Sequence, residues 1–125
     1  MNVNKQITYW RDSGKEDWDV AIDLVASKHI RHGLFFAHLA LEKTLKALVC
    51  QETEAFPPRN HNLLILATKA NIELSDEQKR FVARFDRYQM EGRYPDTLAP
   101  TLDAITAGQE LDQAKDFLEW LAKKF

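Results

Sequence analysis

Residues 34–50 constrain the fold more than any other part of the chain. Placed at about 100° per residue, their apolar side chains cover nearly the whole circumference of a helix. A helix of this kind packs against neighbours on several sides, so the segment is predicted to be the central helix of a bundle. It also carries His38, Glu42, Lys43 and Lys46. Because burying an unpaired charge is costly, we expect these side chains to meet partners or a ligand.

The bulk composition limits the class of protein. The 125 residues suit one domain, residues 1–125, and the formal net charge of −2 means that any site for a polyanion must be local. No DNA specificity is expected. Cys50 is the single cysteine, which excludes an internal disulfide and predicts a buried, inert thiol. The N-terminus lacks the apolar region of a signal peptide, and no segment approaches the roughly 20 apolar residues of a membrane span. We therefore expect a cytoplasmic protein outside the membrane.

Apolar residues before and after the central segment recur at helical spacing. A long first helix is predicted over about residues 4–29, weakened at Ser13 and Gly14. Residues 31–33 are predicted to form a tight turn. The central helix then continues to about Glu52, and the prolines within residues 53–60 prevent its extension.

The second half of the chain is also predicted to be helical. A short third helix begins near Leu63 and ends near Asn71. Ser75, followed by acidic residues, is predicted to cap a fourth helix that ends at Gly92 and Pro95.

A loop then reaches Pro100, and residues 106–109 resemble a capping box at the start of a fifth helix, which carries apolar residues through Phe125. Short connections make neighbouring helices antiparallel. The predicted fold is an all-α antiparallel bundle of about five helices, three of them long.

A group of basic and aromatic residues marks the predicted fourth helix and the segment after it. Guanidinium groups bind phosphate through paired hydrogen bonds, and aromatic rings stack on bases. The pattern therefore favours a nucleotide- or phosphate-binding site, although the same arginines would equally form a solvated face paired with nearby acids. The residues concerned are Arg84, Arg87, Arg93 and Tyr94, with Arg80 interpreted as a solvated residue.

Lys43 and Lys46 on the central helix are candidates for the same site. Glu42 and Lys46 have the spacing of an ion pair within a helix, which is the simpler interpretation. The alternative is that both ammonium groups meet phosphate. His61 follows two prolines and precedes an apolar helix, so it either caps that helix or offers a polar edge to a ligand.

The sequence contains no pattern for metal or cofactor chemistry. His29, His32 and His38 do not share the spacing of a helical zinc site, and neither a glycine-rich phosphate loop nor a catalytic triad is recognisable. We expect no metal and no cofactor.

Several short motifs follow one another along the chain. They are Trp18 with Asp23-Leu24, His38-x-Ala40-x-Glu42-Lys43-x-Leu45-Lys46-Ala47-Leu48, Pro57-Pro58, His61-Asn62-Leu63 and Arg93-Tyr94-Pro95. In this order they resemble the HEPN domain family, and the resemblance spans nearly the whole chain. It implies a helical bundle of about five helices that is usually dimeric and binds a nucleotide or RNA. Small prokaryotic members often act beside a minimal nucleotidyltransferase in modules similar to toxin–antitoxin pairs.

The resemblance also implies a possible activity, because other members are metal-independent ribonucleases. Those members carry an arginine and, four to six residues later, a histidine near the end of the bundle. This chain has no histidine after His61, and Arg31 with His38 matches the spacing only at the start of the central helix. The missing late histidine argues against enzymatic activity and leaves a ribonuclease as an alternative.

Three hypotheses remain open. The first is a binding module in which Lys43, Lys46 and the late arginines meet phosphate, Tyr94 stacks, and His61 donates a hydrogen bond. The second is a metal-independent ribonuclease with an arginine and His61 or His38 as acid and base. The third is a non-catalytic dimeric interaction protein.

Overall fold

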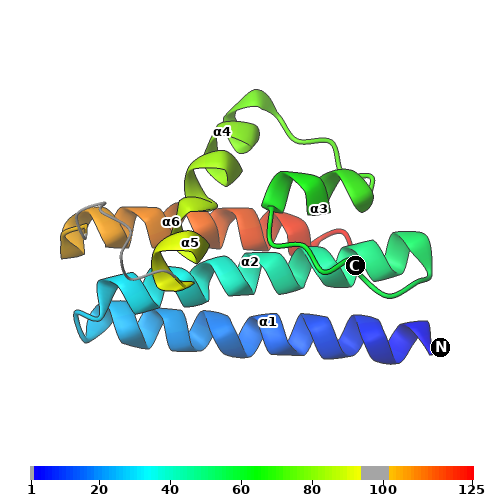
Figure 1. The fold of residues 1–125 in the computed structure, drawn as a ribbon, viewed down its shortest axis with the longest axis horizontal. Helices are drawn as coiled ribbons and strands as arrows, with labels where there is room; N and C mark the ends of the chain where they lie inside the picture. Colours follow the sequence, from blue (N-terminus) through cyan, green and yellow to red (C-terminus); the bar gives the residue numbers. More distant parts are fainter. Residues whose placement is uncertain (1, 94–101) are drawn as a thin grey trace.

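The computed structural model describes residues 2–93 and 102–125, and helices dominate both ranges. The helices are α1 (Val3–Ala26), α2 (Ile30–Thr53), α3 (Leu63–Lys69), α4 (Asp76–Phe85), α5 (Arg87–Arg93) and α6 (Ala104–Ala122). Figure 1 shows the long helices α1, α2 and α6 running lengthwise, with α3, α4 and α5 packed along one side. No strand occurs in the described ranges. The predicted all-α bundle with three long helices is confirmed.

The predicted fourth helix is interrupted. It separates into α4 and α5 at Asp86, so the prediction of one continuous helix was wrong. The Asp86 carboxylate binds α2 and the first residue of α3, which anchors the chain where its direction changes. As a result α5 packs on α2, while α4 extends away from it (Figure 1).

The turn between α1 and α2 lies earlier than predicted. It occupies residues 27–29, with Lys28 in the left-handed region at φ 68°, and residues 31–33 are already helical. Gly33 is not part of the turn but allows α1 and α2 to approach closely. A Cβ at this position would lie 2.5 Å from Val25 Cγ2 and 3.0 Å from the Val25 backbone nitrogen. Gly14 likewise does not weaken α1. It is buried where α1 meets α2, 3.1 Å from Thr44 Oγ1 when a Cβ is added.

Side chains cap α3, α4 and α6, but only the cap of α4 is the residue that the sequence predicts. Ser75 forms the predicted cap of α4, reciprocated by Gln78. Asn62 caps α3. The predicted capping box at residues 106–109 was wrong, because α6 begins earlier and Asp103 accepts the Thr106 backbone N–H at 2.7 Å. This hydrogen bond lowers the pKa of the Asp103 carboxyl, since it stabilises the charged form.

The central position of α2 is confirmed. It contacts α1, α3, α5 and α6, and Leu41, Leu45 and Cys50 on it are fully buried. The predicted burial of Cys50 is confirmed, and this burial raises the pKa of its thiol. Phe81, Phe85 and Tyr88 line the face of α4 and α5 that closes the core. Among the described helices, none has the length and apolar character needed to cross a membrane.

Two glycine substitutions test whether the α1–α2 contact is tight. Gly33→Ala should lower the free energy of unfolding by about 1–3 kcal/mol, because the added methyl group forces α1 and α2 apart. Gly108→Ala on α6 should raise it by roughly 1 kcal/mol, since nothing lies within 4 Å of the new Cβ and alanine favours the helix. Urea denaturation measures both, and equal effects would contradict the assigned packing.

Candidate functional site

The carboxylate of Glu42 lies at the centre of a polar network inside the bundle. Glu42 is only 3% exposed, yet each of its oxygens has a partner. Lys46, one turn later on α2, donates from Nζ to Glu42 Oε2 at 3.1 Å. His61, from the segment before α3, donates from Nδ1 to Glu42 Oε1 at 3.0 Å. The ion pair that the sequence favours for Glu42 and Lys46 is therefore present.

His38 extends this network toward α5. It is fully buried one turn before Glu42, and its Nε2 lies 2.8 Å from Asp86 Oδ1. The same Asp86 oxygen accepts the backbone N–H of Leu63 at 3.2 Å. His38 Nδ1 lies 3.7 Å from Glu42 Oε1, which is too long for a hydrogen bond, and it has no other partner among the described residues. We call His38, Glu42, Lys46, His61 and Asp86 the polar network.

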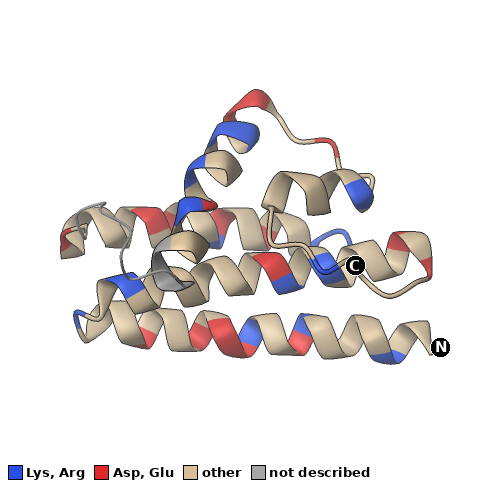
Figure 2. Cartoon of the chain, viewed as in Figure 1, with Lys and Arg blue, Asp and Glu red and all other residues tan. Residues whose placement is uncertain are grey.

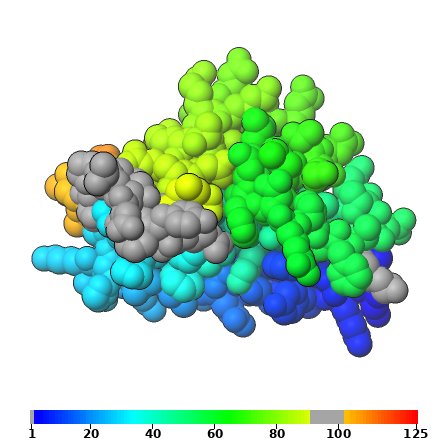
Figure 3. All heavy atoms as spheres, viewed as in Figure 1, coloured from blue at the N-terminus to red at the C-terminus, as the bar shows by residue number. Residues whose placement is uncertain are grey.

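Local sequence explains how His61 returns to α2. The prolines after Phe56 keep the chain extended, and Asn60 accepts the backbone N–H of Asn62 at 2.8 Å. Asn62 then caps α3 through the N–H of Ile65 at 2.9 Å. These bonds fix the backbone on both sides of His61. In Figure 3, the green atoms of α3 and its preceding loop lie beside the yellow-green atoms of α4 and α5.

The network runs from the core to the surface. Lys46 is buried, with Nζ 5.2 Å from the centroid of the Trp10 ring, while the side chain of His61 is 46% exposed. Because a carboxylate only accepts hydrogen bonds, the Glu42 contact places a proton on His61 Nδ1. When the ring is neutral, Nε2 therefore carries the lone pair. Glu42 thus holds one surface imidazole in a single orientation and tautomer.

Lys43 and Arg84 do not join this network. Lys43 faces α1, where its Nζ lies 2.7 Å from Asp17 Oδ2 and donates to Ser13 Oγ at 2.9 Å. Arg84 faces α6, where it contacts Glu110 at 3.2 Å and Gln113 at 2.6 Å. Figure 2 shows that the Lys and Arg positions of the described ranges are distributed over several helices.

Residues on α5 lie closer to the network. Arg87 follows Asp86 directly at the start of this helix, with its guanidinium 5.6 Å from the Tyr88 ring centroid. Arg93 is the last residue of α5, and Tyr94 lies outside the described residues. Since α5 packs on α2, the helix that carries Arg87 and Arg93 borders the polar network. The junction of α2, α3 and α5 is the candidate site.

A second polar cluster ties α4 and α5 to α6. Glu110 is 7% exposed and accepts hydrogen bonds from Arg84 and from the hydroxyl of Tyr88, the latter at 2.9 Å. Burial and the neighbouring Glu110 carboxylate both raise the pKa of Tyr88 far above its usual range. This cluster satisfies Arg84 and anchors α6, which is a structural role.

Sequence reasoning identified Glu42, Lys46 and His61 but not the part played by Asp86 or Glu110. Asp86 was not among the predicted site residues, and its carboxylate contacts His38, which is 48 residues away. Its position immediately after Phe85, an apolar residue that is buried in the core, was the one feature of the sequence that could have indicated a buried partner. Among the described residues, no group of histidine, cysteine and acidic side chains has a geometry suited to a metal ion.

The fold and the site define a small helical-bundle domain whose central helix carries a buried carboxylate–histidine network. The sequence model of the HEPN domain family matches residues 7–125, so the chain belongs to this family. The crystal structure of TT1696 from Thermus thermophilus has a similar fold, with a TM-score of 0.80, 21% identity, and 100% of each chain covered. No curated protein matches the chain.

Replacing Glu42 tests whether the network is a coupled unit. Glu42→Leu should lower the free energy of unfolding by about 3–5 kcal/mol, because it leaves the Lys46 ammonium buried without a partner. The double variant Glu42→Leu with Lys46→Met should recover most of this loss. Urea denaturation of both variants gives the coupling, and a double variant no more stable than the single would show that the two charges act independently.

Tyr88 should make the fold sensitive to alkali. Its pKa is raised in the folded state, so its contribution to stability is complete below about pH 10 and is lost as pH rises above that value. The free energy of unfolding should then fall by up to about 1.4 kcal/mol per pH unit, and Tyr88→Phe should remove this part of the slope. Denaturation between about pH 9 and 11.5 measures it. The exposed Tyr9→Phe is the control, and an equal effect of both variants would contradict the assignment.

Proposed function

We propose that this HEPN-family chain is a binding module for a nucleotide or single-stranded RNA, with the phosphate at the junction of α2, α3 and α5. The observation that carries the proposal is the Glu42–His61 contact. It holds a half-exposed imidazole in one orientation beside the helix that bears Arg87 and Arg93. With Nδ1 held by Glu42, His61 donates from Nε2 to a phosphate oxygen only in its imidazolium form, whereas guanidinium groups donate to phosphate at any physiological pH. The family resemblance supports the same ligand class.

The predicted site residues divide into two groups under this proposal. His61, Arg87, Arg93 and Tyr94 meet the ligand, and for the last two the proposal rests on sequence. Lys46 acts through Glu42, because its ammonium is buried against that carboxylate. The other group comprises Lys43 and Arg84, whose charges are compensated by Asp17 and Glu110. Phosphate would have to displace these acids, so we assign both residues to the scaffold.

The proposal predicts binding that falls with salt. A fluorescein-labelled octauridylate in EDTA should bind the full chain, and Arg87→Gln should weaken this binding about tenfold, or ~1.4 kcal/mol. The slope of log affinity against log salt should decrease in magnitude by about 0.7, the value for one phosphate contact to a single strand. Fluorescence anisotropy measures both quantities.

Arg80→Gln is the matched control, because it removes the same charge from exposed α4. It should leave affinity within about twofold of the unsubstituted chain. His61→Ala should also weaken binding. Equal losses of affinity for Arg80→Gln and Arg87→Gln would show that binding depends on the net charge of the chain and not on this site. An unsubstituted chain that fails to bind octauridylate at low salt would overturn the proposal.

A ribonuclease is the second candidate, because a carboxylate-oriented imidazole is also the arrangement of a general base. Cleavage of the same RNA in EDTA, abolished by His61→Ala and strongly reduced by Glu42→Gln, would favour it. Intact RNA under conditions of saturated binding would favour the binding module.

Two protein partners are proposed from the family resemblance alone: a second copy of the chain and a nucleotidyltransferase. We propose that the chain forms a homodimer and that a minimal nucleotidyltransferase is its partner in a module similar to a toxin–antitoxin pair. Sedimentation of the purified chain tests the first. Co-purification with a nucleotidyltransferase encoded beside it tests the second.

A further inference from the structure

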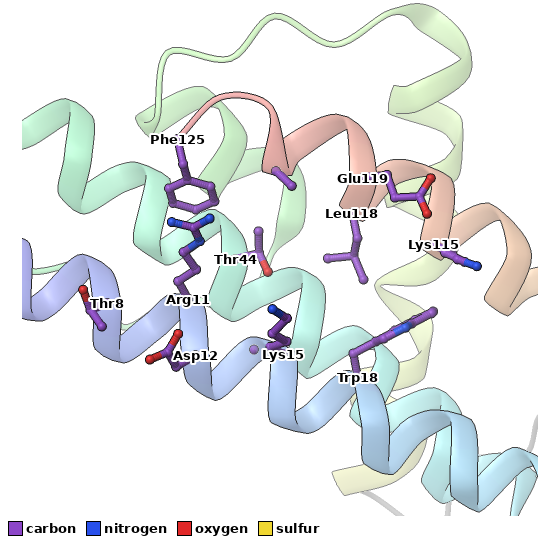
Figure 4. A pocket seen from close by; sticks show the side chains of 12 residues that line it. Thr8, Arg11, Asp12, Lys15, Trp18, Thr44, Lys115, Leu118, Glu119 and Phe125 are labelled. Atoms are coloured by element: carbon purple, nitrogen blue, oxygen red, sulfur yellow. The ribbon is translucent and has the colours of Figure 1, made fainter.

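An open groove lies between α1 and α6, above α2, with a volume of about 460 Å³. This size lies within the range of small-molecule sites. Figure 4 shows Arg11 reaching from α1 toward Phe125 and Leu118 pointing from α6 toward α1. The groove lies apart from the polar network. Thr44 lines it, and Thr44 is two positions from Glu42 and Lys46 on α2, which places it on a different side of that helix.

The groove has an apolar body. Gly14, Leu118 and Ala122 line it, with Trp18 and Phe125 as aromatic surfaces. The hydroxyl of Thr44 donates to the Ala40 carbonyl at 2.8 Å, so its proton is already used. A ligand that fits here therefore buries an apolar, flat body and needs no hydrogen bond from the floor.

Charged side chains surround this apolar body without neutralising one another. Three are cationic, namely Arg11, Lys15 and Lys115, and two are acidic, namely Asp12 and Glu119. Within the part of the chain that the structure describes, none of the five forms an ion pair within 4.0 Å. Arg11 instead lies 4.6 Å from the Phe125 ring centroid. Among these five side chains the excess is one positive charge, which favours an anionic group on the ligand.

We propose that this groove binds a small planar aromatic molecule carrying one negative charge, such as an aromatic carboxylate or sulfonate. The ring system lies between Trp18, Leu118 and Phe125, and the anionic group faces Lys15 and Lys115 at the rim. A nucleotide fits less well, because its phosphate carries more charge than the groove balances and its sugar needs hydrogen-bond partners that the floor lacks. The site is independent of the proposed function at the α2–α3–α5 junction.

The test uses 1-anilinonaphthalene-8-sulfonate, an aromatic monoanion with a planar naphthalene ring system, whose fluorescence rises in apolar surroundings. Titration into the full chain should give saturable binding of one molecule per chain. The uncharged analogue N-phenyl-1-naphthylamine should bind at least threefold more weakly. In amide NMR spectra, the shifts should concentrate on Gly14, Trp18 and the lining residues of α6, and AMP should leave these signals unchanged.

Two kinds of variant locate the site. Lys15→Gln with Lys115→Gln should weaken binding of the sulfonate at least threefold and leave the uncharged analogue unaffected. Ala122→Phe, at an exposed position on the wall, should fill the groove and reduce binding of both compounds at least tenfold. The matched control is Lys5→Gln with Lys69→Gln, which makes the same change of charge at exposed positions outside the groove.

Circular dichroism and urea denaturation should give every variant the helicity and stability of the unsubstituted chain. Equal affinity for the charged and uncharged compounds, equal losses in the matched control, or NMR shifts around His61 instead of Gly14 would each overturn the proposal. Failure of octauridylate binding would refute the proposed function but leave this site intact, because the two readouts concern different residues.

Discussion

The structure depends on one buried carboxylate. Glu42 accepts hydrogen bonds from Lys46 on its own helix and from His61 on the segment before α3, and it lies one turn from His38, which binds Asp86 ahead of α5. Three segments distant in the sequence are thereby joined at the centre of α2. An ion pair of this kind adds little net stability over an apolar core, but breaking it is costly. We infer that it specifies how α3 and α5 are placed on α2.

This placement separates the basic residues of the chain by role. Lys43 and Arg84 each bind an acid on a neighbouring long helix and so contribute to the scaffold. His61 is directed by Glu42 while half of its side chain remains in solvent, and Arg87 stands beside Asp86 at the start of α5. In our proposal the ligand therefore meets His61 at the surface, and the orientation of His61 is set by Glu42 in the core.

The bundle could be predicted from sequence because helical periodicity, proline positions and the Ser75 cap are local signals. The break at Asp86 could not, since it depends on His38, which is 48 residues away. Charges on an apolar helix correctly marked Glu42, Lys46 and His38 as constrained. Their partners were only partly predictable: Lys46 binds the acid one turn away, whereas Arg84 binds Glu110, which is 26 residues away. Spacing identifies residues on one face, and tertiary packing decides which acid each one meets.

The most direct measurement of the central interaction is the protonation of the two imidazole rings. Long-range ¹H–¹⁵N NMR spectra, recorded where both rings are neutral, report which nitrogen carries the proton. The structure predicts opposite tautomers: His61 protonated on Nδ1, toward Glu42, and His38 protonated on Nε2, toward Asp86. A His61 ring that carries its proton on Nε2 would contradict the account, because the Glu42 carboxylate could then not accept a hydrogen bond from Nδ1.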